Sequence, residues 1–325
     1  MKNKGRPITA IDLFCGAGGS SWGARNAGAE IVAGLDMWGL AGKVYQDNFP
    51  RAKFYEGKLE ESDPQSIKRE LGEIDIILAS PECTNHSVAR AGKDPDEESK
   101  ATALQVTRFA EIFEPRWIVV ENVGAMRNWK KYAKFLVSLY ELGYNVRTQM
   151  LNSKNFRVAQ SRARLFIMCD RVRTPPAVTG SADQVPARTI LSANGDYAFS
   201  LLHKRGRAES TIERAERAMN ALGNDTEFLL VYYGSDKAGG FQSLDVPLRT
   251  ITTLDRFALV RPNGGDHEMR MLQPPELRAA MGLPSTFKMR HGSRRERIRL
   301  LGNGVCPPVM TSVLRKLCGH PDSQP

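Results

Sequence analysis

Cys83 is the residue of this chain best placed to do covalent chemistry. It follows the apolar run 76–79 and the turn-forming residues Ser80 and Pro81, a pattern typical of a loop at the carboxyl end of a buried parallel strand. Open α/β sheets bind their ligands at that edge. A thiol there can reach a substrate, whereas most cysteines of soluble proteins fill the core. The sequence therefore predicts a nucleophile at Cys83.

Charged side chains border two further apolar runs. Glu121 follows the run 117–120, where a carboxylate is costly to bury without a partner, and Arg162 and Arg164 precede the run 165–169. Residues at i and i+2 of an extended segment point the same way. The arginines either pair with Glu121 or other acids, or hold an anionic or carbonyl-bearing substrate. Glu121 is correspondingly a structural ion-pair partner or a hydrogen-bonding acid beside Cys83.

A glycine-rich turn follows the first predicted strand, in the sequence Asp12-Leu13-Phe14-Cys15-Gly16-Ala17-Gly18-Gly19. Such a turn either serves tight packing or lets a ligand approach the backbone at a helix N-terminus. Asp36 ends the second predicted strand, where it would accept hydrogen bonds from ribose hydroxyls or cap a helix. Strand, glycine turn, helix, strand and acid in this order predict a nucleoside cofactor.

The elements that position these residues alternate between strands and helices. This alternation predicts an α/β fold with a doubly wound, mostly parallel sheet. From about Arg171 the strand signals become irregular, which indicates a second, smaller lobe with one polar helix. We expect strands at 8–14, 30–35, 74–79, 117–120, 144–151, 165–169, 228–233 and 257–260, and helices at 65–71, 102–113, 129–142, 207–222, 275–281 and 307–317.

Composition narrows the class of partner. The 325 residues carry a net charge of +10, with clusters of basic residues at 129–134 and 290–297. Each cluster alone is typical of a solvated surface. Because the sequence also predicts a catalytic site, we expect these clusters to contact phosphates.

No apolar run is long enough to span a membrane, and the N-terminus has no apolar signal core. The cysteines form no C-x-x-C pair, so we expect neither a zinc site nor a disulfide framework. A reducing cytoplasm fits best. The five cysteines are Cys15, Cys83, Cys169, Cys306 and Cys318.

Taken together, these motifs resemble those of the DNA (cytosine-5) methyltransferases, of prokaryotic or phage type. The resemblance extends over nearly the whole chain in the family's order. It rests on the glycine turn, Pro81-Glu82-Cys83, Glu121-Asn122-Val123, Gln160-Ser161-Arg162-Ala163-Arg164, residues 270–276 and 281–284, and Gly302-Asn303-Gly304-Val305.

The resemblance implies methyl transfer from S-adenosylmethionine to C5 of a cytosine flipped out of a short duplex DNA target. Cys83 would add to C6 and Glu121 would bind the base at N3 and N4. Arg164 would contact O2, with Arg162 in the same pocket. The product would be S-adenosylhomocysteine, and no metal is implied. The implied cofactor residues are Phe14, Gly16, Gly18, Asp36, Met37, Leu59, Pro81 and Asn303.

The chain departs from the family pattern at five residues. Asp36 replaces the usual glutamate, and this shorter side chain should still reach a ribose hydroxyl. Glu82 and Thr84 stand where most members have proline and glutamine, which bears on loop movement and on the pKa of the thiol. Met37 stands where many have a tryptophan against the adenine. Lys58 replaces an aspartate that meets the adenine amino group, and lysine cannot accept that hydrogen bond. Either Glu56 or Glu60 substitutes, or adenine recognition is weaker.

The resemblance also divides the chain. Residues 1–170 and 268–325 would form the S-adenosylmethionine-dependent catalytic domain, and residues 171–267 a compact target-recognition lobe. We expect a monomer in the cytoplasm of a bacterial or phage-infected cell. One alternative is an RNA cytosine-5 methyltransferase. The other is a non-catalytic DNA-binding module, against which the presence of Cys83, Glu121 and Arg164 argues. Candidate phosphate or base contacts in the lobe are Arg188, Lys204, Arg205, Arg207, Tyr232, Tyr233 and Lys237.

Overall fold

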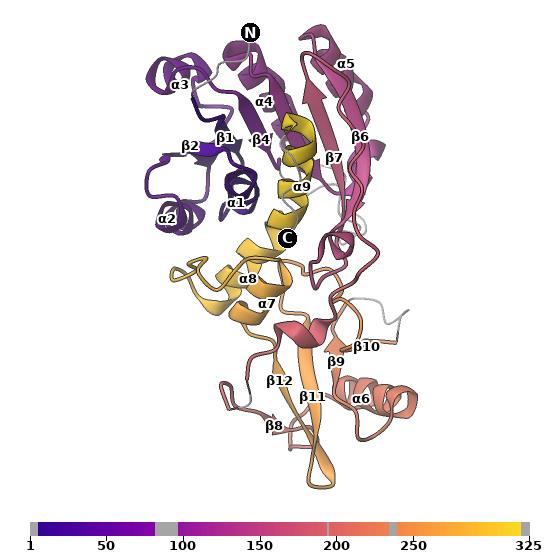
Figure 1. Ribbon diagram of the computed structural model, residues 1–325. Coiled ribbons are helices and arrows are strands. Elements are labelled where there is room, and N and C mark those ends of the chain that lie inside the picture. The colour runs from indigo at the N-terminus through magenta and orange to yellow at the C-terminus, as the bar shows by residue number, and fades with distance from the viewer. Residues whose placement is uncertain (1–5, 82–96, 194, 234–238, 320–325) are drawn as a thin grey trace.

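Two β-sheets organise the chain, one above the other in Figure 1, with helices α7 (Pro274–Ala280) and α8 (Arg294–Asn303) between them. The computed structural model describes residues 6–81, 97–193, 195–233 and 239–319, and only the backbone of residues 97–101. Cys83 and its neighbours Glu82 and Thr84 therefore lie outside the described residues.

The larger sheet has seven strands in the order β3-β2-β1-β4-β5-β7-β6. All neighbouring pairs are parallel except those of β7, which is antiparallel to both β5 and β6. The prediction of a doubly wound, mostly parallel sheet is confirmed. Its strands are β1 (Thr9–Leu13), β2 (Glu30–Asp36), β3 (Lys53–Glu56), β4 (Ile76–Ala79), β5 (Trp117–Asn122), β6 (Asn145–Asn152) and β7 (Ala163–Asp170).

Helices cover both faces of this sheet because successive strand residues point to opposite sides. Ala10 of β1 packs into a core shared with α1, α2 and α9, whereas Ile11 packs against α3, α4 and α5. Both cores are continuous layers of buried apolar side chains. The helices are α1 (Gly19–Asn26), α2 (Gly39–Asn48), α3 (Pro64–Leu71), α4 (Glu97–Phe113), α5 (Tyr132–Glu141) and α9 (Pro307–Cys318).

The smaller sheet is antiparallel, with five strands in the order β10-β9-β11-β12-β8. The irregular strand signals of this region therefore correspond to a regular sheet. Helix α6 (Glu209–Leu222) packs on one face, and the other face joins the core beneath α7 and α8. The predicted boundary at 267/268 falls inside β12, so this sheet extends to Met271. The strands are β8 (Ser200–Leu201), β9 (Phe228–Val231), β10 (Phe241–Ser243), β11 (Phe257–Asn263) and β12 (Asp266–Met271).

Helix α8 carries Asn303 at its last position, and its bounds follow from its sequence. A capping box starts it: Ser293 Oγ accepts from the Glu296 backbone N–H at 3.3 Å, and the Glu296 carboxylate accepts from the Ser293 backbone N–H at 2.8 Å. Near its end, Gly302 touches the lobe so closely that a Cβ would lie 2.3 Å from the Thr252 carbonyl oxygen. Only glycine fits there.

Candidate active site

The candidate residues share one edge of the seven-stranded sheet. The strand order reverses between β1 and β4, and such a switch point opens a crevice at the carboxyl ends of the strands. The glycine turn, Asp36, Pro81 and Glu121 follow or end parallel strands at this edge. Arg164 reaches it because β7 is antiparallel and begins there. The structure thus brings these described candidates to one edge.

The glycine turn has one packed side and one open side. A Cβ on Gly18 (φ 93°) would lie 2.5 Å from Phe49, and one on Gly19 would lie 2.3 Å from the Val305 carbonyl oxygen. A Cβ on Gly16 would meet no described atom within 4 Å. The turn is therefore packed through Gly18 and Gly19 and open at Gly16, which leaves backbone accessible to a ligand.

Asp36 holds this turn in place. One carboxylate oxygen accepts from the Gly16 N–H at 2.8 Å and the other from the Trp38 N–H at 2.9 Å. Burial raises the pKa of Asp36, and these backbone hydrogen bonds oppose the rise. Asp36 is not the N-cap residue of α2, which is Trp38. Each carboxylate oxygen keeps a second lone pair with which it can accept from a ligand hydroxyl.

The apolar residues after Asp36 have different surroundings. Met37 is 56% exposed, whereas Trp38 packs on the core beneath the Arg299 guanidinium, 4.8 Å from its ring. Met37 is therefore the residue free to cover a ligand at this edge. Leu59 is buried, and Asn303 is exposed at the end of α8.

Lys58 stands where the resembled family has an aspartate that binds the adenine amino group, but its side chain makes a different contact. Its ammonium lies 4.0 Å from the exposed Glu61 carboxylate. Arg108 of α4 donates to the carbonyls of Leu59 and Ser62 and so fixes this loop. Glu60 is exposed, while the Glu56 carboxylate lies against Gly39 at the start of α2. Sequence reasoning missed Arg108, since nothing in its helical position marks it as a loop contact.

Glu121 and Arg164 form an ion pair at the ends of neighbouring strands. Arg164 Nε lies 3.3 Å from Glu121 Oε1, and the two side chains are 17% and 7% exposed. Burial raises the pKa of Glu121, while the positive charges of Arg164 and Arg162 lower it. Because burial is the largest cause, Glu121 retains a proton at higher pH than an ordinary glutamate does.

Arg162 has different hydrogen-bond partners from Arg164. Its guanidinium donates to the carbonyls of Ile251, Gly302 and Gly304 at 2.9, 2.7 and 3.0 Å. We expected both arginines to face one substrate pocket. The structure instead places Arg164 against Glu121, whereas Arg162 donates to backbone carbonyls.

Asp12 anchors the helix behind the glycine turn. It is fully buried, and its Oδ2 accepts from the backbone N–H and hydroxyl of Ser21 at 3.1 and 2.6 Å. The Ser21 hydroxyl also lies 2.9 Å from that of Tyr45. Among described residues, nothing donates to Asp12 Oδ1. Burial raises the pKa of Asp12 to about 7, against the hydrogen bonds from Ser21.

We expect the stability of the protein to fall with pH because of Asp12. The unfolded chain releases the Asp12 proton near pH 3.8 and the folded chain near pH 7. The free energy of unfolding should therefore fall by about 3 kcal/mol between pH 5 and 8 relative to Asp12→Asn. Urea unfolding of both proteins at each pH measures this, with the exposed Asp183→Asn as control. Parallel profiles for wild type and Asp12→Asn would contradict it.

Several lobe candidates are already engaged within the protein. Arg188 pairs with Glu227 and Asp245 at 3.2 and 3.0 Å, and Arg207 donates to the Leu201 and Leu202 carbonyls. The Tyr233 hydroxyl donates to the Thr250 carbonyl at 2.6 Å, and the Arg214 guanidinium lies over the Tyr232 ring. Lys204 and Arg205 are exposed. Lys237 lies outside the described residues.

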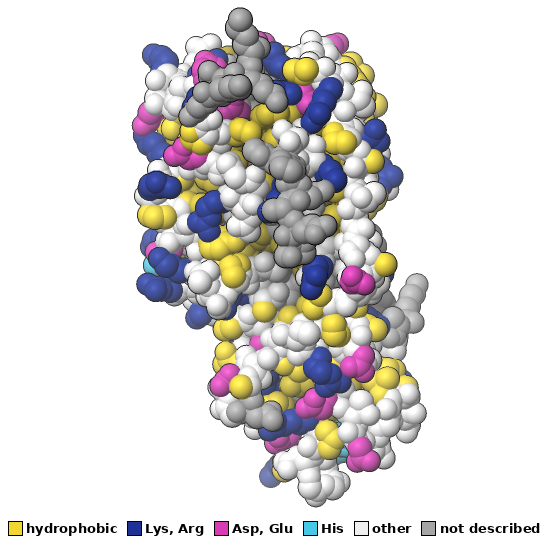
Figure 2. All heavy atoms as spheres, viewed as in Figure 1, with side chains coloured by type: hydrophobic (Ala, Val, Ile, Leu, Met, Phe, Trp, Pro, Cys, Tyr) yellow, Lys and Arg dark blue, Asp and Glu magenta, His cyan; other side chains and the backbone are white. Residues whose placement is uncertain are grey.

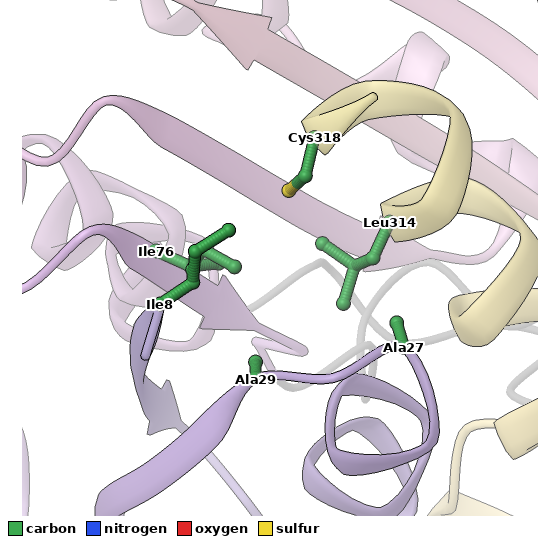
Figure 3. Close-up of a pocket in the computed structure, with 6 residues that line it drawn as sticks. All are labelled: Ile8, Ala27, Ala29, Ile76, Leu314 and Cys318. Carbon is green, nitrogen blue, oxygen red and sulfur yellow. The ribbon is translucent and has the colours of Figure 1, made fainter. Parts of the chain in front are cut away.

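A small cavity lies at the opposite, amino-terminal edge of the sheet. Figure 3 shows its apolar lining around Ile8, Ile76 and Leu314, with the Cys318 sulfur pointing inward. Its lining side chains offer no hydrogen-bonding group other than the Cys318 thiol, so they do not provide the polar contacts that a nucleoside needs. The described residues contain no group of three or more His, Cys, Asp or Glu side chains that could hold a metal. Nor is any described helix both long and apolar enough to cross a membrane.

Comparison with known proteins gives matches along most of the chain. A family model described as C-5 cytosine-specific DNA methylase matches residues 8–319. The type II methyltransferase M.HgiDI of Herpetosiphon aurantiacus is 25% identical over 305 residues, covering 92% of this chain and 90% of that protein. M.DdeI of Desulfomicrobium norvegicum is 29% identical over 186 residues, which cover 52% of this chain and 44% of the relative. The match with this relative thus spans less than half of its length.

Solved structures share the fold at low sequence identity. A mutant DNMT2 of Spodoptera frugiperda has a TM-score of 0.72 at 19% identity, with 96% of this chain and 99% of that chain covered. A putative DNA modification methyltransferase from an E. coli prophage has a TM-score of 0.69 at 17% identity, with the same coverage. Likeness at this level shows the architecture of both sheets.

Proposed function

Because the chain belongs to the C-5 cytosine-specific DNA methylase family, we propose that it methylates C5 of a cytosine in a short duplex DNA target. The family match over residues 8–319 carries this proposal. The meeting of the glycine turn, Asp36 and the Glu121–Arg164 pair at one sheet edge supports it. Relatives named as type II methyltransferases support it further.

The residues around the glycine turn fit S-adenosylmethionine. The open side of Gly16 gives backbone access, and Asp36 can accept from ribose hydroxyls. Met37 exposes a thioether that can cover an adenine ring. We assign the remaining contacts to Phe14, Gly18, Leu59, Pro81 and Asn303. When bound, S-adenosylmethionine supplies an electrophilic methyl group.

The chain's own residues would make cytosine reactive. The target carbon lies inside the base stack, so the base must be flipped into the site. The Cys83 thiolate adds to C6, and Glu121 donates its proton to N3 as electrons move toward the ring nitrogen. Arg164 would bind the base oxygen while orienting Glu121. C5 becomes electron-rich and takes up the methyl group, after which N3 returns its proton to Glu121. A base then removes the C5 proton, and that electron pair forms the C5–C6 double bond and expels the Cys83 thiolate, which leaves 5-methylcytosine.

A basic segment beside the site supports a nucleic-acid substrate. Residues 288–299 contain six Lys or Arg and one Glu, which is half of the chain's net charge of +10. Arg290, Arg295 and Arg299 are exposed there. Figure 2 shows dark blue side chains along the left flank of the upper body, at the level of α2 and α8. Such a surface attracts a phosphate backbone.

We expect the purified protein to convert cytosine to 5-methylcytosine in duplex DNA given S-adenosylmethionine. Nucleoside mass spectrometry identifies the product, with Cys83→Ala as the inactive control. Bisulfite sequencing of DNA from expressing cells then gives the target sequence. 5-Methylcytosine in RNA alone would favour the RNA alternative, and methylation at another atom would contradict the proposal.

A further inference from the structure

Arg162 lies where three distant parts of the chain meet. Its side chain is 4% exposed, and it stands one residue before β7. One guanidinium nitrogen donates to the Ile251 carbonyl, and another donates to both Gly302 and Gly304. Ile251 belongs to residues 248–252. We call these residues the return segment, because they lead into β11 and β12 of the smaller sheet. Gly302 and Gly304 flank Asn303.

The return segment is fixed alongside residues 159–162. The Ser161 N–H donates to the Leu248 carbonyl at 2.7 Å, and the Leu248 N–H donates to that of Ala159 at 2.9 Å. The Gln160 side chain accepts from the Ile251 N–H at 2.9 Å and is fully buried. The position of the return segment, and with it that of the lobe, is therefore set by the residues around Arg162.

The segment 302–305 is packed between the return segment and the glycine turn. On one side, a Cβ on Gly302 would lie 2.3 Å from the Thr252 carbonyl oxygen. On the other, a Cβ on Gly19 would lie 2.3 Å from that of Val305. Neither contact leaves room for adjustment. A shift of the 302–305 backbone would therefore move the backbone of Val305, against which the glycine turn packs at Gly19.

We propose that Arg162 is a positioning residue that sets both the cofactor side and the DNA side of the site without contacting the base. It orders the 302–305 segment against the glycine turn and the return segment against β7. Arg164, two residues later, meets Glu121 instead. The inference rests on the proposed function, because it assigns the cofactor to the glycine turn and DNA to the lobe.

The test separates the two arginines by binding rather than by activity alone. Lysine keeps the charge of Arg162, but its donors all leave one nitrogen, whereas the planar guanidinium reaches the Ile251 carbonyl from one nitrogen and the Gly302 and Gly304 carbonyls from another. In Arg162→Lys we expect the Kd for S-adenosylhomocysteine, measured by calorimetry without DNA, to rise roughly tenfold. The Kd for a DNA duplex that contains the target sequence found by bisulfite sequencing should also rise roughly tenfold. In Arg164→Lys, the Kd for S-adenosylhomocysteine should stay within about twofold while kcat falls.

Arg173→Lys is the matched control, since Arg173 also donates to a backbone carbonyl, that of Leu317 at 3.0 Å, far from the site. If Arg162→Lys lowers kcat and leaves both Kd values as in wild type, the role is overturned and Arg162 is a substrate contact. If Arg162→Lys does not fold, Arg162→Gln carries the test with the same two measurements, because its amide can still donate to one carbonyl. Unchanged Kd values for S-adenosylhomocysteine and for DNA in that variant would contradict the proposal. Wild type that binds no S-adenosylhomocysteine refutes the proposed function instead.

Discussion

Replacement of Cys83 with serine is expected to lower methyl transfer by at least about a thousandfold. C6 of cytosine is a poor electrophile, and a serine hydroxyl is far less ionised at neutral pH than a thiol and a weaker nucleophile. Initial rates with radiolabelled S-adenosylmethionine and duplex DNA measure the loss. The Kd for S-adenosylhomocysteine should change little, because Cys83 is assigned to the base and not to the cofactor.

The control for this substitution is Cys318→Ser. Cys318 lines the apolar cavity at the opposite edge of the sheet (Figure 3), so its loss should leave the rate near that of wild type. A duplex with 5-fluorocytosine at the target gives a second readout. The fluorine blocks the final elimination, so wild type should form a covalent adduct that resists denaturing gel electrophoresis. Near-normal turnover of Cys83→Ser would end the proposed mechanism.

Replacement of Glu121 with glutamine is expected to reduce kcat by about 10²–10⁴-fold. Glutamine keeps the shape and a hydrogen-bond donor but has no proton to transfer to N3. Burial already raises the pKa of Glu121, which favours the protonated form needed for this step. Single-turnover rates at saturating S-adenosylmethionine measure the effect. The matched control is Glu114→Gln, because Glu114 is an exposed carboxylate that also pairs with an arginine, Arg171, but precedes β5 and so lies near the end of that strand opposite Glu121.

The same carboxyl group should give an alkaline limb to the pH–rate profile. Activity falls as pH rises through the pKa of Glu121, because the proton donor is lost. The positive charge of Arg164 lowers that pKa, so Arg164→Gln should move the limb to higher pH while reducing the maximal rate. A limb that moves to lower pH in this variant, or a limb that persists in Glu121→Gln, would show that another group titrates.

The sheet could be predicted from sequence wherever its strands are buried on both faces. The apolar runs of β1, β2, β4 and β5 stand out because both sides of each strand meet helices. β3 (Lys53–Glu56) has no such signal, since it is a short edge strand with no buried residue. α2 was also missed. It contains Gly42, a poor helix former, whose Cβ would lie 2.3 Å from Phe54.

The sequence could predict those residues of the candidate site that lie at the carboxyl ends of strands. Each strand of known direction brings its last residues to one edge, which is how Asp36 and Glu121 could be grouped with the glycine turn. The partners of Arg162 could not be found this way. They are backbone carbonyls about 90 and 140 residues further along the chain, and a carbonyl carries no sequence signal. The burial that raises the pKa of Asp12 likewise depends on packing from α1 and α2.

The position of α9 has a consequence for how the chain acquires its structure. α9 follows the lobe in sequence, yet it covers the same face of the large sheet as α1: the Thr311 hydroxyl donates to the Gly23 carbonyl at 3.0 Å, and Met310 fills the space that a Gly23 Cβ would occupy. Residues 1–170 hold Cys83, Glu121 and Arg164, but without α9 they expose buried residues such as Ile76, which lies beside Leu314 and Cys318 of α9. The large sheet therefore completes its core only when the part of the chain that follows the lobe is in place. Many native contacts join residues far apart in sequence, and folding is correspondingly slow. A truncation that removes α9 should aggregate rather than retain partial activity.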